Sequence, residues 1–241
     1  MRALVTALPR QFLEWNYFPR RKAIEESLEG RDRQDMNRFF LDSTRHNPAF
    51  CTANRRPDGS IYVNAKIVGM GYVLKREYLS AAIEALELHM RSGDEMLRRA
   101  GNAEEKASAM REYQREGLTL LSSHLYFEAE EAERRVDFTR MSTLELARDL
   151  PHSSKHTWQI VKENRSACVL YYRPPSVSFE LHGTVEIVEK GDYCDFVNGV
   201  HNAFHYVPDE QRRTKWPVYL FTVEEVYDNG PGRDSFGKRI A

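Results

Sequence analysis

The sequence predicts an α+β fold in which a small, mainly β barrel carries helical caps and a helical insertion. Extended segments occur between residues 48 and 74 and again from residue 167 onward. The region between them changes to the periodicity of amphipathic helices. Turn signals, Pro57-Asp58-Gly59 and Pro174-Pro175, separate neighbouring extended segments. We therefore expect one domain with an elaboration.

The first 47 residues are predicted to form a helical N-terminal extension. They read as an irregular start followed by helical stretches, in which four apolar residues are spaced so that one face could be buried. These residues are Met36, Phe39, Phe40 and Leu41. Residues 48–241 would then form the barrel domain, interrupted by the helical insertion at about residues 76–148.

A β-hairpin opens the barrel domain in this prediction. The short apolar run at residues 49–53 and the extended pattern at 61–63 flank the turn at Asp58-Gly59. A third strand is expected over residues 71–74, after glycines that permit a bend.

The insertion is predicted to contain two or three amphipathic helices. Asn102 with Glu105 is typical of a capping box at the start of the second helix. Ser142 with Glu145 offers another cap, which predicts a short helix that ends before Pro151. The charged faces of these helices are expected to be solvated, and the insertion could also serve as a docking surface for a protein partner.

The C-terminal part alternates helices and strands. A helix is expected from about Ser154 to Asn164, followed by strands at residues 167–172 and from residue 177 onward, the second of which continues past Gly183. A helix at 193–206 and a last strand at 216–226 complete the predicted barrel.

Composition excludes several classes of partner. The net charge is −1 and the isoelectric point about 6.7, so we expect neither nucleic acid nor an anionic membrane as a partner. No apolar run is long enough to span a bilayer. The cysteines Cys51, Cys168 and Cys194 show no CxxC spacing, which favours a reducing, intracellular compartment. The cytoplasm is favoured over mitochondria, although the first two dozen residues are basic.

Two regions on either side of the insertion resemble a known family. The segment from Ser153 to Arg165, with Glu180-Leu181-His182-Gly183 further on, and the hairpin from Phe50 to Lys66 are similar to the pyridoxamine 5'-phosphate oxidase-like superfamily of FMN-binding proteins. The resemblance covers about half of the chain. It implies a split β-barrel of the FMN-binding type in a divergent member, and a homodimer.

The same resemblance implies a binding site for FMN. Its phosphate would need cationic and hydroxyl donors near a strand end and a helix N-terminus. The residues that the resemblance assigns to the cofactor are Asn64, Lys66, Ser153, Ser154, Lys155 and Thr157. No catalytic residue is identified, and no metal is expected.

Two features depart from the family pattern. Glu180 stands where related proteins often carry a basic residue, and Asn64-Ala65-Lys66-Ile67 replaces a Ser-Pro-Lys-Gly run. Two hypotheses therefore remain. The chain is either an FMN-binding oxidoreductase of unidentified substrate, or a split-barrel protein without cofactor that serves as a structural or assembly subunit of a larger complex, in mitochondria or elsewhere. Two or more converging cations in the predicted phosphate pocket would favour the FMN-binding oxidoreductase. An unopposed Glu180 in that pocket would favour the protein without cofactor.

Other candidate groups carry weaker signals. His201 and His205 share a helix face at a spacing that suits a metal, but no third ligand is apparent. His152, His156 and His182 could titrate near a substrate, although single histidines are usually ordinary hydrogen-bonded residues. Cys51 and Cys168 are interpreted as core residues. Tyr171, Tyr172 and Trp216 are expected in the core or at a dimer contact, or stacked on a flavin.

Overall fold

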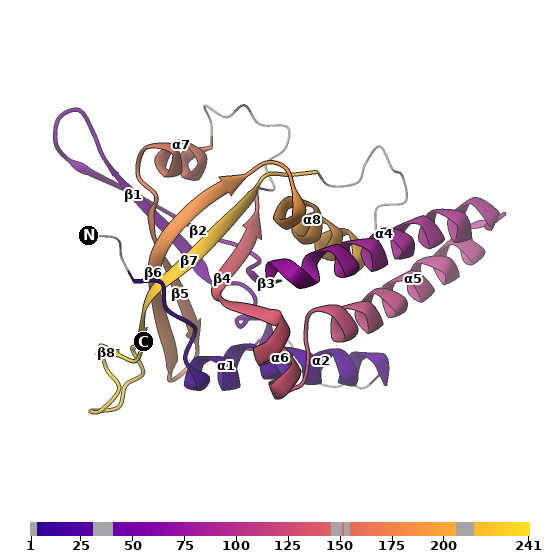
Figure 1. The fold of residues 1–241 in the computed structure, drawn as a ribbon, viewed down its shortest axis with the longest axis horizontal. Coiled ribbons are helices and arrows are strands. Elements are labelled where there is room, and N and C mark those ends of the chain that lie inside the picture. Colours follow the sequence, from indigo (N-terminus) through magenta and orange to yellow (C-terminus); the bar gives the residue numbers. More distant parts are fainter. Residues whose placement is uncertain (1–3, 31–40, 146–150, 152–154, 206–214) are drawn as a thin grey trace.

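The computed structural model describes residues 4–30, 41–145, 151, 155–205 and 215–241. These residues form an antiparallel sheet of eight strands together with seven helices (Figure 1). The sheet is strongly curved but open, because its path begins at β2 and ends at β3 without pairing these two edges. The predicted α+β fold class of the split-barrel type is thus confirmed.

The strands follow the order β2-β1-β5-β6-β7-β4-β3, with β8 paired to β7. Their bounds are β1 Ala49–Arg55, β2 Ile61–Ile67, β3 Gly71–Leu74, β4 Val136–Leu144, β5 Ser166–Arg173, β6 Val177–Val188, β7 Val218–Asp228 and β8 Lys238–Arg239. The expected hairpin is formed by β1 and β2. At its tip Gly59 has a φ of 85°, and Asp58 accepts hydrogen bonds from the backbone and hydroxyl of Ser60.

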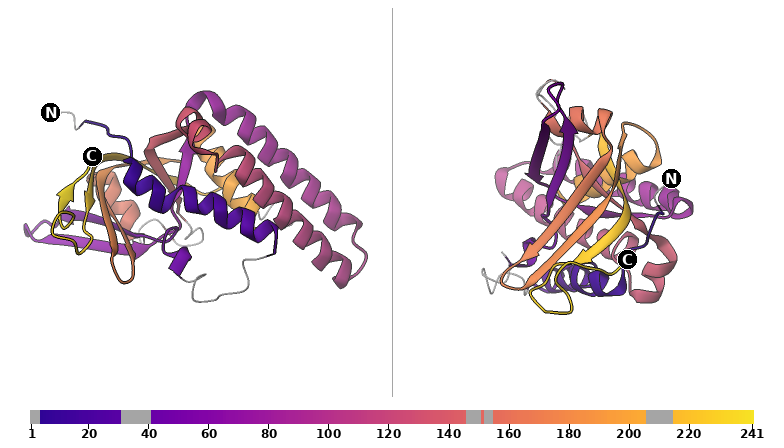
Figure 2. Two further views of the ribbon diagram at one scale, coloured as in Figure 1. Left: turned by 90° about the horizontal axis from the view of Figure 1, so that it is seen from below. Right: turned by 90° about the vertical axis from the view of Figure 1, so that its left-hand side faces the viewer.

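The helices are α1 Arg10–Asn16, α2 Phe18–Leu28, α4 Arg76–Arg99, α5 Ala103–His124, α6 Ala129–Arg135, α7 His156–Glu163 and α8 Asp192–Phe204. Helices α4 and α5 form a long antiparallel pair that extends beyond the sheet (Figures 1 and 2). The capping box predicted for α5 is confirmed, since the Asn102 side chain accepts from the Glu105 amide at 2.9 Å. None of the described helices is long and apolar enough to cross a membrane.

The sheet has a buried inner face and a partly exposed outer face. Across the strands, Lys66 of β2 lies opposite Phe50, which lies opposite Val169, which lies opposite Leu181. Phe50, Val169 and Leu181 are fully buried and form part of the core. Because side chains alternate along a strand, the neighbouring row through Glu180 points to the outer face.

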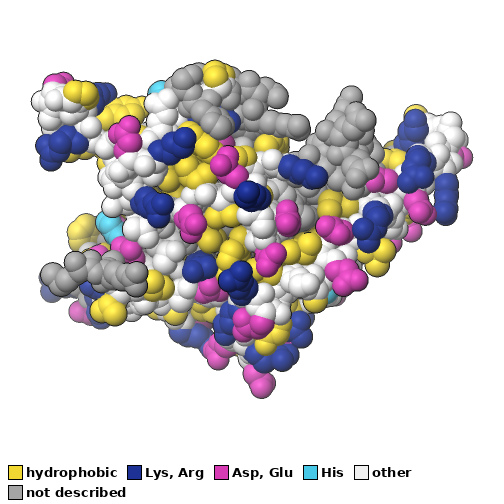
Figure 3. Space-filling view, turned by 45° about the horizontal axis from the view of Figure 1, so that its top comes forward, with side chains coloured by type: hydrophobic (Ala, Val, Ile, Leu, Met, Phe, Trp, Pro, Cys, Tyr) yellow, Lys and Arg dark blue, Asp and Glu magenta, His cyan; other side chains and the backbone are white. Residues whose placement is uncertain are grey.

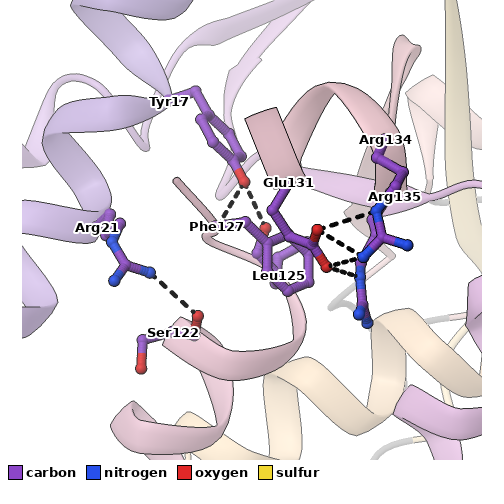
Figure 4. A network of polar contacts seen from close by, with 8 residues as sticks. All are labelled: Tyr17, Arg21, Ser122, Leu125, Phe127, Glu131, Arg134 and Arg135. Carbon is purple, nitrogen blue, oxygen red and sulfur yellow. Dashed lines mark hydrogen bonds and ion pairs between the residues drawn. The ribbon is translucent and has the colours of Figure 1, made fainter. Parts of the chain in front are cut away.

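The N-terminal segment adds to the same core. Helices α1 and α2 confirm the helical stretches expected there, and the backbone amide of Leu8 donates to the carbonyl of Phe138 in β4. The buried hydroxyl of Tyr17 donates to the carbonyl of Leu125 at 2.7 Å and accepts from the amide of Phe127 at 2.8 Å (Figure 4). Met36, Phe39 and Phe40 lie outside the described residues. The division into residues 1–47 and 48–241 stays a prediction.

The prediction of a helix that starts at Ser142 is wrong. Residues 136–144 form strand β4, which pairs with β3 on one side and β7 on the other, with Ser142 opposite Gly71 and Leu220. Glu145 extends this pairing, because its amide donates to the carbonyl of Pro217 at 2.9 Å. Strand pairing on both sides outweighs a local capping pattern, since it satisfies the backbone groups and buries the alternate apolar side chains.

Candidate functional site

The start of helix α7 meets the inner face of strand β2. The Asn64 amide donates to the Thr157 hydroxyl at 2.9 Å, and the Tyr62 hydroxyl lies 2.8 Å from Nδ1 of His156. Lys155 is the residue just before the first helical residue of α7. These contacts attach the helix N-terminus to the sheet edge. Lys66 lies on the same side of β2 as Asn64, and Lys155 precedes Thr157 by two residues, so we call Asn64, Lys66, Lys155 and Thr157 the β2–α7 cluster.

Lys66 lies beside a buried acid. Its ammonium group is 3.5 Å from the carboxylate of Glu145 and 5.2 Å from the ring centre of Tyr219. The Tyr219 hydroxyl donates to the same carboxylate at 2.5 Å. Burial and this hydrogen bond to a carboxylate raise the pKa of Tyr219 well above its usual value. Glu145, which the sequence suggested only as a helix cap, therefore neutralises part of the positive charge in the cluster.

Lys155 is the most enclosed cation of the cluster. Only 7% of the residue is exposed. Within the described part of the chain, its ammonium group forms no hydrogen bond or ion pair. The stem of the side chain is covered, whereas the ammonium group is not among the buried polar atoms that lack a partner, so its charge is accessible to an anionic ligand.

The six predicted cofactor residues are thus placed as follows. Asn64 and Thr157 are in direct contact, Lys66 lies on the same side of β2 as Asn64, and Lys155 precedes Thr157 by two residues at the start of α7. Ser153 and Ser154 lie outside the described residues. The role of all six in binding a cofactor stays a prediction.

Glu180 is not part of this cluster. It lies opposite Leu170 on the outer face, and Lys66 belongs to the inner row through Phe50 and Val169. The expectation that Glu180 could repel a phosphate in the pocket is therefore wrong, because the alternation of β6 turns its side chain to the opposite side of the sheet. Glu145 is the acid that lies beside the predicted phosphate ligands.

Glu180 instead joins three other side chains on the outer face. Its Oε1 atom lies 2.5 Å from Nε2 of His182 and 3.7 Å from Sγ of Cys168, and its Oε2 atom accepts from the Asn229 amide at 2.8 Å. Partial burial acts to raise the pKa of Glu180, but the hydrogen bonds from His182 and Asn229 hold it below its usual value. Burial and the neighbouring carboxylate raise the pKa of the Cys168 thiol to about 12.

The outer-face group was not found from the sequence. Cys51 lies directly opposite Cys168, which lies directly opposite His182, so one row crosses β1, β5 and β6. Cys51 and Cys168 are half-buried rather than core residues. Cys51 is far from the other two in the sequence, and only the strand register brings them together. Within the described residues, Cys168, Glu180 and His182 form the one group of three or more potential metal ligands.

The remaining candidate residues lie elsewhere. The ring of His201 in α8 lies 4.7 Å from the ring of His205, the residue that follows the helix, and His201 also contacts Trp216. Tyr171 is fully buried, whereas Tyr172 is 54% exposed on the outer face. His152 lies outside the described residues.

Two surface cavities are distinct from the β2–α7 cluster. One of about 290 Å³ lies between Gln11, Asp228 and the loop at 232–235. The other, of about 270 Å³, lies between α4 and α8 and is lined by residues that include Leu86, Met90 and Asn198. Neither is lined by a predicted cofactor residue.

Comparison with known proteins gives structural neighbours only. No protein-family model matches the chain, and no curated protein matches it. One similar structure is that of HupZ from Group A Streptococcus, with a TM-score of 0.38, 12% identity, and coverage of 82% of this chain and 97% of HupZ. Another, from Listeria innocua, is named "Putative Pyridoxamine 5'-phosphate oxidase" and has a TM-score of 0.37, 11% identity, and coverage of 80% and 98%. At these scores, the split-barrel assignment rests on the strand order and pairing described above.

Proposed function

We propose that the chain is an FMN-binding oxidoreductase that holds the cofactor phosphate at the β2–α7 cluster. The observation that carries the proposal is Lys155, a largely covered lysine at the N-cap of α7 whose ammonium group has no anionic partner in the described part of the chain. Backbone amides at a helix N-terminus and the helix dipole favour an anion at this position.

The chemistry of the cluster fits a phosphate. Lys66 and Lys155 supply two positive charges, and Glu145 supplies one negative charge, so a positive charge remains for a phosphate. Thr157 and Asn64 add a hydroxyl and an amide. In this arrangement the lysines would bind the phosphate, and Asn64 would orient Thr157 through their hydrogen bond. The bound flavin would supply the electron transfer.

A second candidate function is supported by the Lys66–Glu145 pair. An acid that already neutralises a predicted phosphate ligand favours a split-barrel protein without cofactor, which acts as a structural or assembly subunit. Helices α4 and α5, which project from the sheet, would then provide the docking surface (Figure 1). Basic and acidic side chains are interspersed over the face in Figure 3, so a partner there would need charges of both signs.

Under either function, we propose that the chain forms a homodimer through the outer face of the sheet. On β2 the exposed side chains are apolar and the half-buried ones are polar, which is the reverse of the usual arrangement. The exposed apolar residues of the outer face are Ile61, Val63, Ile67, Leu170 and Tyr172. A second copy of this nearly neutral chain would meet little charge repulsion there.

The deciding experiment is a visible absorption spectrum of the full chain after incubation with FMN and desalting. The proposal expects retention of one flavin per chain. Lys155→Glu should lose the flavin by placing a negative charge beside the phosphate, whereas Lys190→Glu, an exposed change of equal charge, should retain it. Absence of flavin from the folded wild-type chain would reject FMN binding and favour the subunit hypothesis. Equal retention of flavin by both variants would show that the phosphate does not bind beside Lys155.

A further inference from the structure

The outer face of the sheet carries a set of side chains whose chemistry the proposed flavin site does not use. Cys168 on β5 and Glu180 and His182 on β6 have their ligand atoms within 4.8 Å of one another. A thiol, an imidazole and a carboxylate are the three side-chain types that bind zinc in proteins. Magnesium and calcium prefer oxygen ligands, so this donor set selects against them.

We propose that Cys168, Glu180 and His182 bind a divalent cation of the zinc class, with Cys51 as the fourth ligand. A tetrahedral zinc ion with one sulfur and one oxygen ligand places these two atoms about 3.5 Å apart. The observed distance between Sγ of Cys168 and Oε1 of Glu180 is 3.7 Å. The hydrogen bond from His182 to Glu180, at 2.5 Å, would open by less than about 1 Å to admit the ion between them.

Strand register places Cys51 at the fourth position. It lies directly opposite Cys168 in the β1–β5 ladder, so both thiols are on the outer face. Directly opposite side chains have Cβ atoms about 5 Å apart, which lets a change of rotamer bring the Cys51 sulfur to the ion. The complete site would join three strands, and each bound thiol would release its proton to solvent as its metal–sulfur bond forms.

Asn229 gives the site an orienting group. Its side-chain amide donates to Oε2 of Glu180 at 2.8 Å, which leaves Oε1 directed at His182 and Cys168. The backbone amide of Asn229 in turn donates to the carbonyl of Ser178 in β6. Groups that fix a ligand carboxylate in this way are typical of metal sites in proteins.

The site is independent of the proposed flavin site. Lys66 and Phe50 lie on the inner row, whereas Cys51 and Cys168 lie on the outer row of the same sheet. Loss of flavin binding would therefore leave the metal site intact, and the reverse also holds.

The test is titration of the full chain, reduced with a phosphine, with Co²⁺ and then Zn²⁺. We expect one equivalent of Co²⁺ to bind with an absorption band for charge transfer from thiolate to cobalt, and Zn²⁺ to displace it. Cys168→Ser and His182→Gln should each weaken binding at least about 100-fold, and Asn229→Ala about 10- to 100-fold. The matched thiol control is Cys194→Ser, because Cys194 is buried in α8 and contacts the carbonyl of Trp216. It should bind like the wild type.

Three results would overturn the proposal. They are the absence of the charge-transfer band in the folded wild-type chain, its persistence in Cys168→Ser, and its loss in Cys194→Ser. Far-ultraviolet circular dichroism establishes that each variant is folded. Cys51→Ser should roughly halve the band, since the number of bound thiolates falls from two to one, and an unchanged band would remove Cys51 from the ligand set.

Discussion

The ammonium group of Lys66 lies 3.5 Å from the carboxylate of Glu145. Tyr219 donates a hydrogen bond to the same carboxylate, which is almost completely buried. The lysine predicted to bind a phosphate thus already has an anion beside it. A phosphate at the β2–α7 cluster would compete with Glu145 for Lys66.

Replacing Glu145 with glutamine should strengthen FMN binding about tenfold, because one negative charge is removed beside the phosphate. The same change should cost about 1 to 3 kcal/mol of stability, since Tyr219 loses a charged hydrogen-bond acceptor. Quenching of flavin fluorescence measures the affinity, and urea unfolding measures the stability. Glu186→Gln, an exposed change of the same type, is the control. Weaker binding by Glu145→Gln would show that the acid assists the cofactor instead of competing with it.

Alanine at Gly183 should destabilise the protein by about 3 kcal/mol. Gly183 lies at a bulge in β6, and a Cβ atom there would lie 2.0 Å from the carbonyl oxygen of Thr222 and 2.9 Å from the ring of Phe221. The control is Gly71→Ala, because a Cβ atom at Gly71 would meet nothing within 4 Å. Thermal unfolding should separate the two variants clearly, and similar midpoints would show that the neighbouring strands adjust.

Acid should destabilise the helical region partly through His89. This side chain is 2% exposed, lies stacked on Tyr113 at 4.0 Å, and has a pKa that burial lowers to about 4. The unfolded chain binds a proton below about pH 6.5, whereas the folded chain does so only near pH 4, so stability is lost as the pH falls between these values.

Between about pH 6.5 and pH 4, we expect His89 to lower the free energy of unfolding by about 1 kcal/mol for each unit that the pH falls. His89→Phe retains the ring stack and should remove that share of the pH dependence. Urea unfolding at about pH 7, 6 and 5 measures the slopes of wild type and variant. Parallel slopes would show that other groups account for the acid sensitivity.

Glutamate at Val63 should convert the proposed dimer to a monomer. Val63 lies on the outer face of β2 and is 62% exposed. Leu88 on α4 is equally exposed but lies on the projecting helices, so Leu88→Glu is the control. Sedimentation velocity should show the change for Val63→Glu only, because a charge buried between two apolar faces is costly. A wild-type chain that sediments as a monomer would reject the dimer itself.

The local patterns in the sequence predicted much of the fold. The Asp58-Gly59 turn and the Asn102 capping box both act within a few residues, so their physical causes were visible in the sequence. Strand β4 was missed because its partners, β3 and β7, are distant in the chain. Tertiary pairing of this kind overrides a local helix signal.

The candidate site was predictable only where the family resemblance reached. Asn64 and Thr157 do meet, as the resemblance implied. No sequence spacing could place Glu145 beside Lys66, or Cys51 in a row with His182, because both relationships depend on register across several strands. A one-residue shift of register would have turned Lys66 away from Glu145 and Cys51 away from His182.

The reversed burial of β2 has a consequence for how the chain behaves at high concentration. Its β-branched residues face outward, its outer edge has no partner strand in the described part of the fold, and Lys66 is its one charged residue. Such an edge is a template for adding further strands from other chains, and proteins usually protect it with charge or proline. A chain without the proposed dimer partner on this face would therefore be prone to aggregation through β2, even while the rest of the fold stays intact.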